Sequence, residues 1–325
     1  MKNLIKDTSS IFPDTRVGIS SISFSKSYIL RKEVTQAFPN SFFNEKGCRF
    51  SELELAGFLK NADAAIIGVE PVTDQVLVQA PNLKMISKYG VGLDNIDQDL
   101  LKYRGIKLGW TGGVNRRSVA ELTLCFMLGL CRNVFASGHT LKQSKWEKEG
   151  GWQLSEKNIG IIGCGHVGSD IIKLLAPLKC NILVCDIINK SEFCKEHNAT
   201  QTNIENLTAK SDIISLHVPL TSLTSEIVDK NFIDRMQTTA YLINTSRGGV
   251  VNENDLKTAL IKNDIAGAAL DVFAEEPPAD EEFLSLPNLM VSPHIGGNAK
   301  EAVEAMGRSA IGHLVTFFKN QSKKI

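Results

Sequence analysis

Residues 158–175, NIGIIGCGHVGSDIIKLL, constrain the fold of this chain more than any other segment. An apolar run predicts a strand, a G-x-G-x-x-G loop follows, and the amphipathic residues after the loop predict a helix. Gly163 permits a tight turn, Gly165 lets the backbone approach a pyrophosphate, and Gly168 lets the helix pack closely on the strand. The free N–H groups at the helix N-terminus are donors for phosphate. The segment therefore predicts a dinucleotide-binding unit.

A second predicted strand, NILVCD, supplies the residue that distinguishes between dinucleotide cofactors. It ends in Asp186, 18 residues after Gly168, where such folds place a carboxylate that accepts hydrogen bonds from the adenosine ribose diol. The same carboxylate would repel the 2′-phosphate of NADP. Ile187 and Ile188 carry no positive charge that would offset this repulsion. Lys190 is the nearby base that could offset part of it. We predict NAD as the cofactor.

Short apolar runs alternate with amphipathic stretches along the chain. Apolar strands separated by helices are typical of a parallel sheet covered on both faces, so we predict an α/β fold. Helical patterns cover residues 168–178 and 253–263. The expected strands are residues 17–21, 64–68, 84–87, 158–162, 181–185, 213–216, 240–244, 266–270 and 289–291.

Length, charge and cysteine content exclude several classes of protein. A chain of 325 residues predicts two domains, and equal numbers of basic and acidic residues, 36 each, argue against a nucleic acid or an anionic membrane as partner. The seven cysteines form no CxxC pair, so we expect neither a disulfide framework nor a metal site. Residues 1–14 lack the apolar core of a signal peptide, and residues 122–131 are about half as long as a membrane span. We expect a cytoplasmic protein.

Residues 118–134, SVAELTLCFMLGLCRNV, predict a helix that is apolar nearly all round, with Ser118 and Glu121 spaced as a capping box. Such a helix is buried either in its own domain or against a second subunit. The polar residues 137–151, which include Trp146, are expected to form an exposed arm.

Three later segments place reactive side chains after predicted strands. They carry Arg247 in YLINTSRGGVVNE, His294 in LMVSPHIGG, and Asp271, Glu275 and Glu276 in AALDVFAEEPP. An Arg can bind a substrate carboxylate or carbonyl through two donors, and a His can carry a proton near neutral pH. A Glu can orient the imidazole ring and favour its charged form. Taken singly, each residue is better explained by a structural role. Together, behind a nucleotide-binding unit, they indicate an active site.

These segments resemble those of the D-isomer-specific 2-hydroxyacid dehydrogenases. The similar motifs run in family order over roughly two-thirds of the chain, and the first 80 residues are similar only loosely. The motifs are SKYGVGLDNID (from Ser87), NRRSVAELT (from Asn115), GIIGCGHVG (from Gly160), LHVPLT (from Leu216), LINTSRGGVV (from Leu242), ALDVFAEEP (from Ala269) and SPHIGG (from Ser292).

The resemblance implies that Arg247, Glu276 and His294 are the catalytic residues. Glu276 is chosen over Glu275 because it directly precedes the proline and lies five residues after Asp271, as in the family pattern. The cofactor-binding residues that the resemblance and the glycine loop imply are Val91, Gly163, Gly165, His166, Val167, Gly168, Asp186, His217, Val218, Pro219, Thr245, Ser246, Asp271, Gly296 and Gly297. Among these, Asp271 matches an acid that contacts the nicotinamide carboxamide. The implied substrate-binding residues are Lys88, Tyr89, Gly90, Val91 and Arg247.

The resemblance also implies two Rossmann-like or flavodoxin-like domains with parallel sheets, the nucleotide-binding domain being inserted into the catalytic domain. Residues 1–112 and 298–325 would form the catalytic domain, and residues 113–297 the NAD-binding domain. In relatives, the helix and arm around residues 118–152 build a homodimer, which we expect here as well.

Within the family, SSISFSKS together with KYGVGLDN most resembles the 3-phosphoglycerate dehydrogenases, which makes D-3-phosphoglycerate and 3-phosphohydroxypyruvate the first candidate substrates. Lys88 stands where those enzymes often have Arg. Glyoxylate, hydroxypyruvate and a branched 2-keto acid are the alternatives. The chain ends 31 residues after His294, so we expect no C-terminal regulatory domain. A second class, NADH-sensing corepressors that bind peptides, is disfavoured because both ends of the chain are short.

Overall fold

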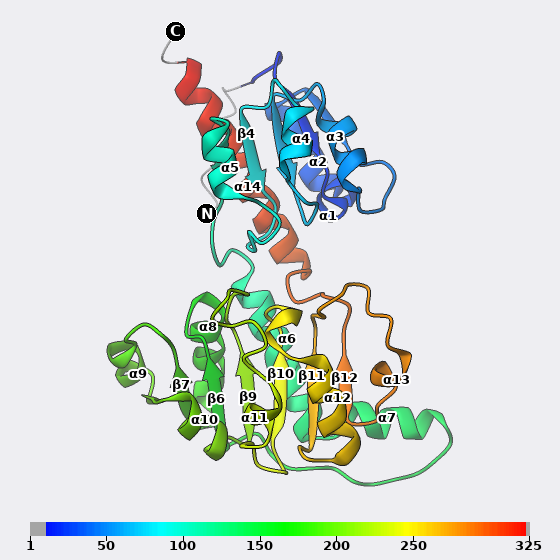
Figure 1. Ribbon diagram of the computed structural model, residues 1–325, viewed down its shortest axis with the longest axis vertical. Coiled ribbons are helices and arrows are strands. Elements are labelled where there is room, and N and C mark those ends of the chain that lie inside the picture. The colour runs from blue at the N-terminus through cyan, green and yellow to red at the C-terminus, as the bar shows by residue number, and fades with distance from the viewer. Residues whose placement is uncertain (1–10, 323–325) are drawn as a thin grey trace. The chain divides into compact units, whose positions relative to one another are not determined.

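The structure is a computed structural model that describes residues 11–322, and it divides into two compact units (Figure 1). The first unit combines Met1–Asn115 with Asn298–Ile325, and the second is Arg116–Gly297. The first unit is thus built from both ends of the chain and the second from its middle. The prediction that residues 1–14 contain no signal peptide falls mostly on residues 1–10, which lie outside the described range.

A parallel sheet of five strands forms the centre of the first unit, in the order β2-β1-β3-β4-β5. This order is the one found in flavodoxin-like folds. The strands are β1 (Arg16–Ile19), β2 (Asn40–Phe43), β3 (Ala64–Ile67), β4 (Met85–Lys88) and β5 (Lys107–Gly109). The helices are α1 (Ile22–Lys26), α2 (Tyr28–Ala37), α3 (Glu52–Leu59), α4 (Asp74–Val78), α5 (Gln98–Tyr103) and α14 (Lys300–Ser322).

Helix α14 completes the core of the first unit, although it comes from the far end of the chain. Met306, Ala310 and Leu314 are buried in the same apolar cluster as side chains of β1, β3 and β4. The hydroxyl of Ser87 in β4 donates to the carbonyl of Ala310 at 2.9 Å. Side chains of α3, α4 and α5 bury the opposite face of the sheet. The sheet is therefore covered on both faces, as predicted.

The second unit contains a parallel sheet of seven strands, in the order β12-β11-β10-β9-β6-β7-β8. The direction of progression reverses between β6 and β9, and open α/β sheets bind ligands at such a point. The strands are β6 (Asn158–Ile162), β7 (Asn181–Cys185), β8 (Ala199–Gln201), β9 (Ile213–Leu216), β10 (Tyr241–Asn244), β11 (Gly267–Leu270) and β12 (Leu289–Val291). The helices are α6 (Arg116–Cys131), α7 (Val134–Lys142), α8 (His166–Leu175), α9 (Ser191–Glu196), α10 (Ile204–Lys210), α11 (Lys230–Ile233), α12 (Glu253–Lys262) and α13 (Glu281–Leu284), with 3₁₀ turns η1 (Ala176–Leu178) and η2 (Gly248–Val250).

The α/β class, the parallel sheets and all of the expected strands are confirmed. Strands β2, β5 and β8 were not predicted. Each of them is only partly buried and lacks a continuous apolar run.

The capping box expected at Ser118 and Glu121 is wrong. Helix α6 begins earlier, at Arg116, so Ser118 lies inside its first turn, and its hydroxyl donates to the carbonyl of Gly296. The helix buries one face against α8 and the sheet, while Leu128 on its other face is 41% exposed. Leu122, Leu124 and Leu130 are partly buried against the same core, so packing within the unit accounts for most of the apolar side chains of α6.

The segment after α6 is exposed, as predicted. None of the residues of α7 is buried, and Trp146 beyond it lies in the exposed arm. Among the helices that the structure describes, none alone is long and apolar enough to cross a membrane, and only α6 and α7 together, bent by 65°, meet that test by length and composition. Residues 11–322 contain no group of three His, Cys, Asp or Glu side chains that could hold a metal ion.

Candidate active site

The glycine loop joins β6 to α8, and its three glycines have different surroundings. Gly163 has a φ of +92°, and a Cβ there would meet the carbonyl oxygen of His217 at 2.5 Å. A Cβ at Gly168 would meet the carbonyl oxygen of Gly163 at 2.0 Å, so this glycine lets α8 pack on the turn. A Cβ at Gly165 would meet no heavy atom within 4 Å, and Gly165 brings no capping side chain to α8. Its open backbone and the first N–H groups of the helix, which begins with His166, fit a pyrophosphate.

Asp186 follows β7 and is held by two backbone N–H groups. The N–H of Cys164 donates to Oδ2 at 2.7 Å, and that of Ile188 donates to Oδ1 at 2.8 Å. Each carboxylate oxygen keeps a second lone pair for a further donor. The next residue, Ile187, is 93% exposed. Asp186 is thus hydrogen-bonded to the glycine loop, and its carboxylate can still accept hydrogen bonds from a ribose diol.

The segment after β9 lies against the glycine loop. A Cβ at Gly163 would meet Cγ1 of Val218 at 2.8 Å, while Pro219 is exposed. Nε2 of His217 hydrogen-bonds the hydroxyl of Ser215 at 2.9 Å, whereas its buried Nδ1 has no partner among the described residues. Burial lowers the pKa of His217 to about 3, so the ring is neutral at physiological pH.

Thr245 and Ser246 form the turn that follows β10. The buried hydroxyl of Thr245 hydrogen-bonds that of Thr123 in α6 at 2.9 Å. Ser246 donates to Oδ1 of Asn244 from its N–H at 3.0 Å and from its hydroxyl at 2.8 Å. These bonds fix the backbone that leads into Arg247.

Arg247 stands beside a close contact between two loops. Nδ2 of Asn244 donates to its carbonyl at 2.8 Å, and its own NH1 donates to the carbonyl of the preceding residue at 2.7 Å. A Cβ at Gly248 would lie 1.8 Å from the carbonyl carbon of Phe273. Only glycine fits there, and it lets the Arg247 turn lie directly on the segment that leads to Glu276.

His294 and Glu276 are in direct contact. Nδ1 of His294 lies 2.8 Å from Oε2 and 3.0 Å from Oε1 of Glu276, and the N–H of Phe273 donates to Oε1 at 3.2 Å. Burial acts to raise the pKa of Glu276, but the hydrogen bond and charge of His294, together with the Phe273 N–H and the charge of Arg247, outweigh it and lower that pKa. Glu275 is exposed and forms no hydrogen bond or ion pair within the described part of the chain. Of the two adjacent acids, the structure therefore places Glu276 against the imidazole.

Asp271, which follows β11 and is 1% exposed, fastens the segment that carries His294. Its Oδ1 accepts from the hydroxyl of Ser292 at 2.5 Å and from the N–H of Ile295 at 2.8 Å. Its Oδ2 accepts from the N–H of Gly296 at 2.7 Å. Sequence reasoning assigned Asp271 a contact with the cofactor and missed both this anchoring and Ser292. The SPHIGG motif contained Ser292, but nothing in it indicated the partner.

Lys88 ends β4 in the first unit. It is 6% exposed, and its ammonium donates to the carbonyl of Gly68 at 2.5 Å and to Oδ1 of Asn95 at 2.6 Å. The sequence suggested Lys88 as a cation that binds an anionic substrate. In the structure its ammonium is instead hydrogen-bonded to acceptors of the protein.

Tyr89, Gly90 and Val91 continue from Lys88. The ring of Tyr89 is buried, and burial raises the pKa of its hydroxyl. Gly90 has a φ of +117°, which favours glycine. The carbonyl of Val91 accepts from the indole N–H of Trp110 at 2.9 Å, a contact that the sequence did not indicate.

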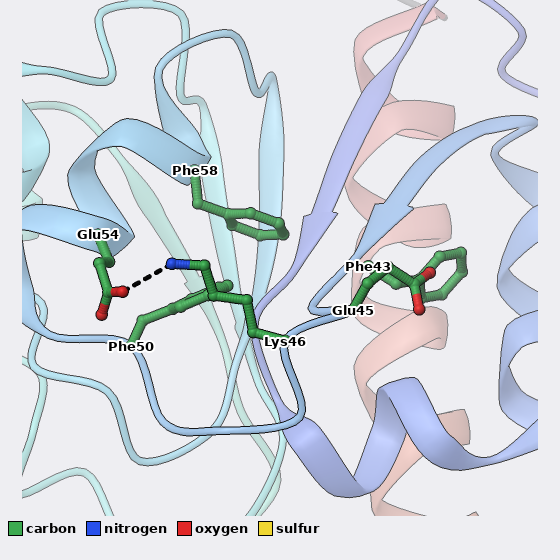
Figure 2. Close-up of a pocket in the computed structure, with 6 residues that line it drawn as sticks. All are labelled: Phe43, Glu45, Lys46, Phe50, Glu54 and Phe58. Carbon is green, nitrogen blue, oxygen red and sulfur yellow. Dashed lines mark hydrogen bonds and ion pairs between the residues drawn. The ribbon is translucent and has the colours of Figure 1, made fainter.

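The first unit also has a surface hollow beside β2. Figure 2 shows its lining, which includes the ion pair between Lys46 and Glu54, 2.7 Å long. The residues that line it are Phe43, Glu45, Lys46, Phe50, Glu54 and Phe58. None of them belongs to the predicted site.

The second unit brings most of the predicted residues together at one edge of its sheet. Arg247, Asp271 and His294 follow the neighbouring strands β10, β11 and β12, and the glycine loop and Asp186 follow β6 and β7. Gly297 ends the unit. The predicted substrate loop, residues 88–91, belongs to the first unit.

Comparison with known proteins identifies relatives over most of the chain. Residues 124–296 match the family model described as the D-isomer specific 2-hydroxyacid dehydrogenase, NAD binding domain. The hydroxypyruvate reductase of Thermotoga maritima is 35% identical over 286 residues, which cover 86% of this chain and 92% of that protein. The glyoxylate reductase of Thermococcus litoralis is 36% identical over 81% of this chain and 82% of its own.

Two further relatives bear on substrate and cofactor. The D-3-phosphoglycerate dehydrogenase of Methanocaldococcus jannaschii is 36% identical over 78% of this chain, but the match spans only 49% of that protein. Among solved structures, a D-lactate dehydrogenase from Aquifex aeolicus complexed with NAD and lactic acid has a TM-score of 0.81 at 25% identity, covering 96% of this chain and 97% of that one.

Proposed function

The chain belongs to the D-isomer specific 2-hydroxyacid dehydrogenase family and is an NAD-dependent oxidoreductase, and we propose that Arg247, Glu276 and His294 form its catalytic group. The contact between His294 and Glu276 carries this proposal. A carboxylate on Nδ1 orients the imidazole, stabilises the imidazolium and assigns proton transfer to Nε2.

Each residue of this group has a separate task. Bound NAD(H) supplies the hydride that is exchanged with C2 of the substrate. Arg247 binds the substrate carboxylate through two N–H donors and polarises the adjacent carbonyl. In reduction, His294 donates its Nε2 proton to the oxygen at C2, and in oxidation the neutral ring takes that proton back. Glu276 balances the positive charge of the ring while the proton is present.

The cofactor is held, in this proposal, by backbone more than by side chains. The open backbone at Gly165 and the N–H groups of His166 and Val167 would bind the pyrophosphate. Asp186 would bind the ribose diol and disfavour a 2′-phosphate. Asp271 would act mainly by positioning His294, because three donors already occupy its carboxylate.

The substrate in this proposal is a small 2-hydroxy or 2-keto acid. D-3-phosphoglycerate with 3-phosphohydroxypyruvate is the first candidate, supported by the motifs around residues 20–27 and 88–95 and by the relatives of that name. Glyoxylate or hydroxypyruvate is the alternative, supported by relatives that this chain covers over most of their length.

We also propose a homodimer formed through α6 and α7. Val134, Phe135 and Leu141 are apolar and exposed, and nothing in the second unit covers α7. A two-fold interface is the commonest way to bury such a face. Sedimentation at micromolar concentration should show a dimer, and a monomer would contradict this assignment.

The activity is tested by following NADH absorbance with a panel of 2-keto acids, including 3-phosphohydroxypyruvate, hydroxypyruvate and glyoxylate. At least one acid should be reduced, and His294→Ala should lose most of kcat, since general acid catalysis typically contributes about 10²–10⁴-fold. A His294→Ala variant with unchanged kcat would refute the catalytic group.

A further inference from the structure

Gln201 is the last residue of β8, the strand at one edge of the seven-stranded sheet. In the parallel register it lies opposite Val184 of β7, and β7 leads into residues 186–190, here called the ribose loop. The N–H of Thr202 continues the pairing by donating to the carbonyl of Val184 at 2.8 Å. The side chain of Gln201 therefore starts beside the loop that opens with the proposed ribose-binding residue, Asp186.

The amide group of Gln201 binds the backbone of the ribose loop at three places. Its Oε1 accepts from the N–H of Lys190 at 2.7 Å, and its Nε2 donates to the carbonyl of Ile188 at 3.0 Å and to that of Asp186 at 3.4 Å. An amide side chain has one acceptor oxygen and two N–H donors, so the oxygen and both donors are in use. One side chain thus holds every second residue of the loop.

Apolar packing contributes little to holding the ribose loop. Ile187 and Ile188 are 93% and 60% exposed. Asn189 is exposed as well, and its Oδ1 accepts locally, from the N–H and the hydroxyl of Ser191. The conformation of the loop therefore depends mainly on its hydrogen bonds to Gln201 and to the glycine loop.

The contact with Ile188 links Gln201 to the carboxylate of Asp186. The carbonyl of Ile188 accepts from Gln201, and the N–H of Ile188 donates to Oδ1 of Asp186 at 2.8 Å. A residue that is bound at both its carbonyl and its N–H has little freedom to turn. Its N–H therefore keeps a fixed direction toward the carboxylate, and Gln201 acts on Asp186 without binding the carboxylate itself.

We propose that Gln201 is a positioning residue for cofactor selection, which fixes the ribose loop so that the carboxylate of Asp186 faces the ribose diol of NAD(H). The inference rests on the proposed function, in which Asp186 binds that diol and disfavours a 2′-phosphate. Without the bonds from Gln201, the loop would have to be ordered when the cofactor binds, and this ordering opposes binding. NADH would then bind more weakly, while NADPH, which the carboxylate disfavours, would lose less.

Gln201→Met tests the proposal, because it keeps the length of the side chain and removes all three hydrogen bonds. Dissociation constants for NADH and NADPH are measured by nicotinamide fluorescence on the full chain without a substrate, so that no turnover occurs. The constant for NADH should rise at least about tenfold, the equivalent of one or two ordinary hydrogen bonds, and that for NADPH should rise by a smaller factor. Gln201→Glu keeps the acceptor for Lys190 but cannot donate to the two carbonyls, so it should weaken NADH binding as well.

Gln237→Met is the matched control. Gln237 is also a partly buried residue of the second unit, and its Nε2 donates to the carbonyl of Ser211 at 3.3 Å. The two residues precede β10 and β9, at the opposite end of the sheet from the ribose loop. The substitution removes a glutamine hydrogen bond far from the cofactor, so both dissociation constants should stay unchanged. If it weakened NADH binding as much as Gln201→Met does, the effect would be a general loss of stability and the inference would be overturned.

A double-mutant cycle with Asp186→Ala shows whether Gln201 acts through Asp186. In the Asp186→Ala background, Gln201→Met should weaken NADH binding only slightly further, because the carboxylate that Gln201 positions is gone. Natural NADH affinity in Gln201→Met or Gln201→Glu, or an undiminished effect of Gln201→Met in that background, would overturn the inference. If Asp186→Ala alone left the preference for NADH over NADPH unchanged, the ribose assignment in the proposed function would fail instead.

Discussion

Replacing Asp271 by Asn tests whether this carboxylate positions the catalytic histidine. The carboxylate accepts three donors from the segment of residues 292–296, two on Oδ1 and one on Oδ2. An amide has only one acceptor atom. In the better of its two orientations, its oxygen keeps the bonds from Ser292 and Ile295, and its NH2 group faces the N–H of Gly296.

The cost follows from these contacts. One hydrogen bond to a charged group is lost, a buried N–H is left without an acceptor, and two donors face each other at a site that is 1% exposed. Together these effects amount to about 2–4 kcal/mol. Since 1.4 kcal/mol corresponds to a factor of ten, the segment should open about 30- to 1,000-fold more often. Ser292→Ala removes one donor without creating a clash, so it should cost only about 1 kcal/mol.

Hydrogen–deuterium exchange of the peptide that spans residues 289–297 measures this opening directly. In Asp271→Asn the amides of Ile295 and Gly296 should exchange faster by the factor given above, and kcat should fall because His294 lies between the anchors. Unchanged exchange would refute the anchoring role. If NADH also bound more weakly while exchange stayed unchanged, the carboxylate would serve the cofactor, as sequence reasoning held.

Three further variants test the rest of the site. Asp186→Ala should raise KM for NADH and reduce the preference of the enzyme for NADH over NADPH. If the natural protein preferred NADPH, the assignment of Asp186 to the ribose diol would be contradicted. Arg247→Lys should raise KM and lower kcat for 2-keto acids with little change in NADH binding, because an ammonium lacks the paired planar donors of a guanidinium; unchanged turnover would rule out substrate binding by Arg247. Glu276→Gln should reduce kcat and should also destabilise the protein by no more than about 1 kcal/mol near neutral pH, since both partners of its ion pair are partly exposed. The pKa of Glu276 is lowered in the folded protein, so this stabilisation is present above the ordinary pKa and is lost as the pH falls through the lowered value. Urea unfolding at several pH values should therefore show the difference between Glu276→Gln and the natural protein vanish in acid, whereas Glu275→Gln should show no difference at any pH.

Much of the fold could be predicted from local pattern. Strands β6, β7 and β9 are buried and apolar, and their predicted bounds agree with the structure. β2 and β8 could not be found in this way, because edge strands are partly exposed and carry no continuous apolar run. The start of α6 was misplaced because Ser118 satisfies the capping pattern, yet its hydroxyl bonds Gly296, a residue 178 positions away.

In the site, too, some features depend on neighbouring residues in the sequence and others on contacts between distant residues. The G-x-G-x-x-G loop could be found because its glycines stand at a fixed spacing within one strand–loop–helix segment. The anchoring by Asp271 depends on N–H groups some 24 residues further along the chain, and the contact at Gly248 depends on the backbone of Phe273. Neither the composition nor the hydrophobic periodicity of the sequence indicates which distant residues form these contacts.

The return of α14 to the first unit has a consequence for synthesis of the chain on the ribosome. Residues 11–115 are synthesised before the second unit, but one apolar face of their sheet is closed by side chains of α14, which is synthesised after the second unit. The hydrogen bond between Ser87 and Ala310 joins residues 223 positions apart. The second unit, whose core is contiguous in sequence, can close while the first still exposes β1, β3 and β4. The first unit can therefore complete its core only after the second unit has been synthesised, and until then it exposes an apolar sheet face of the kind that chaperones bind.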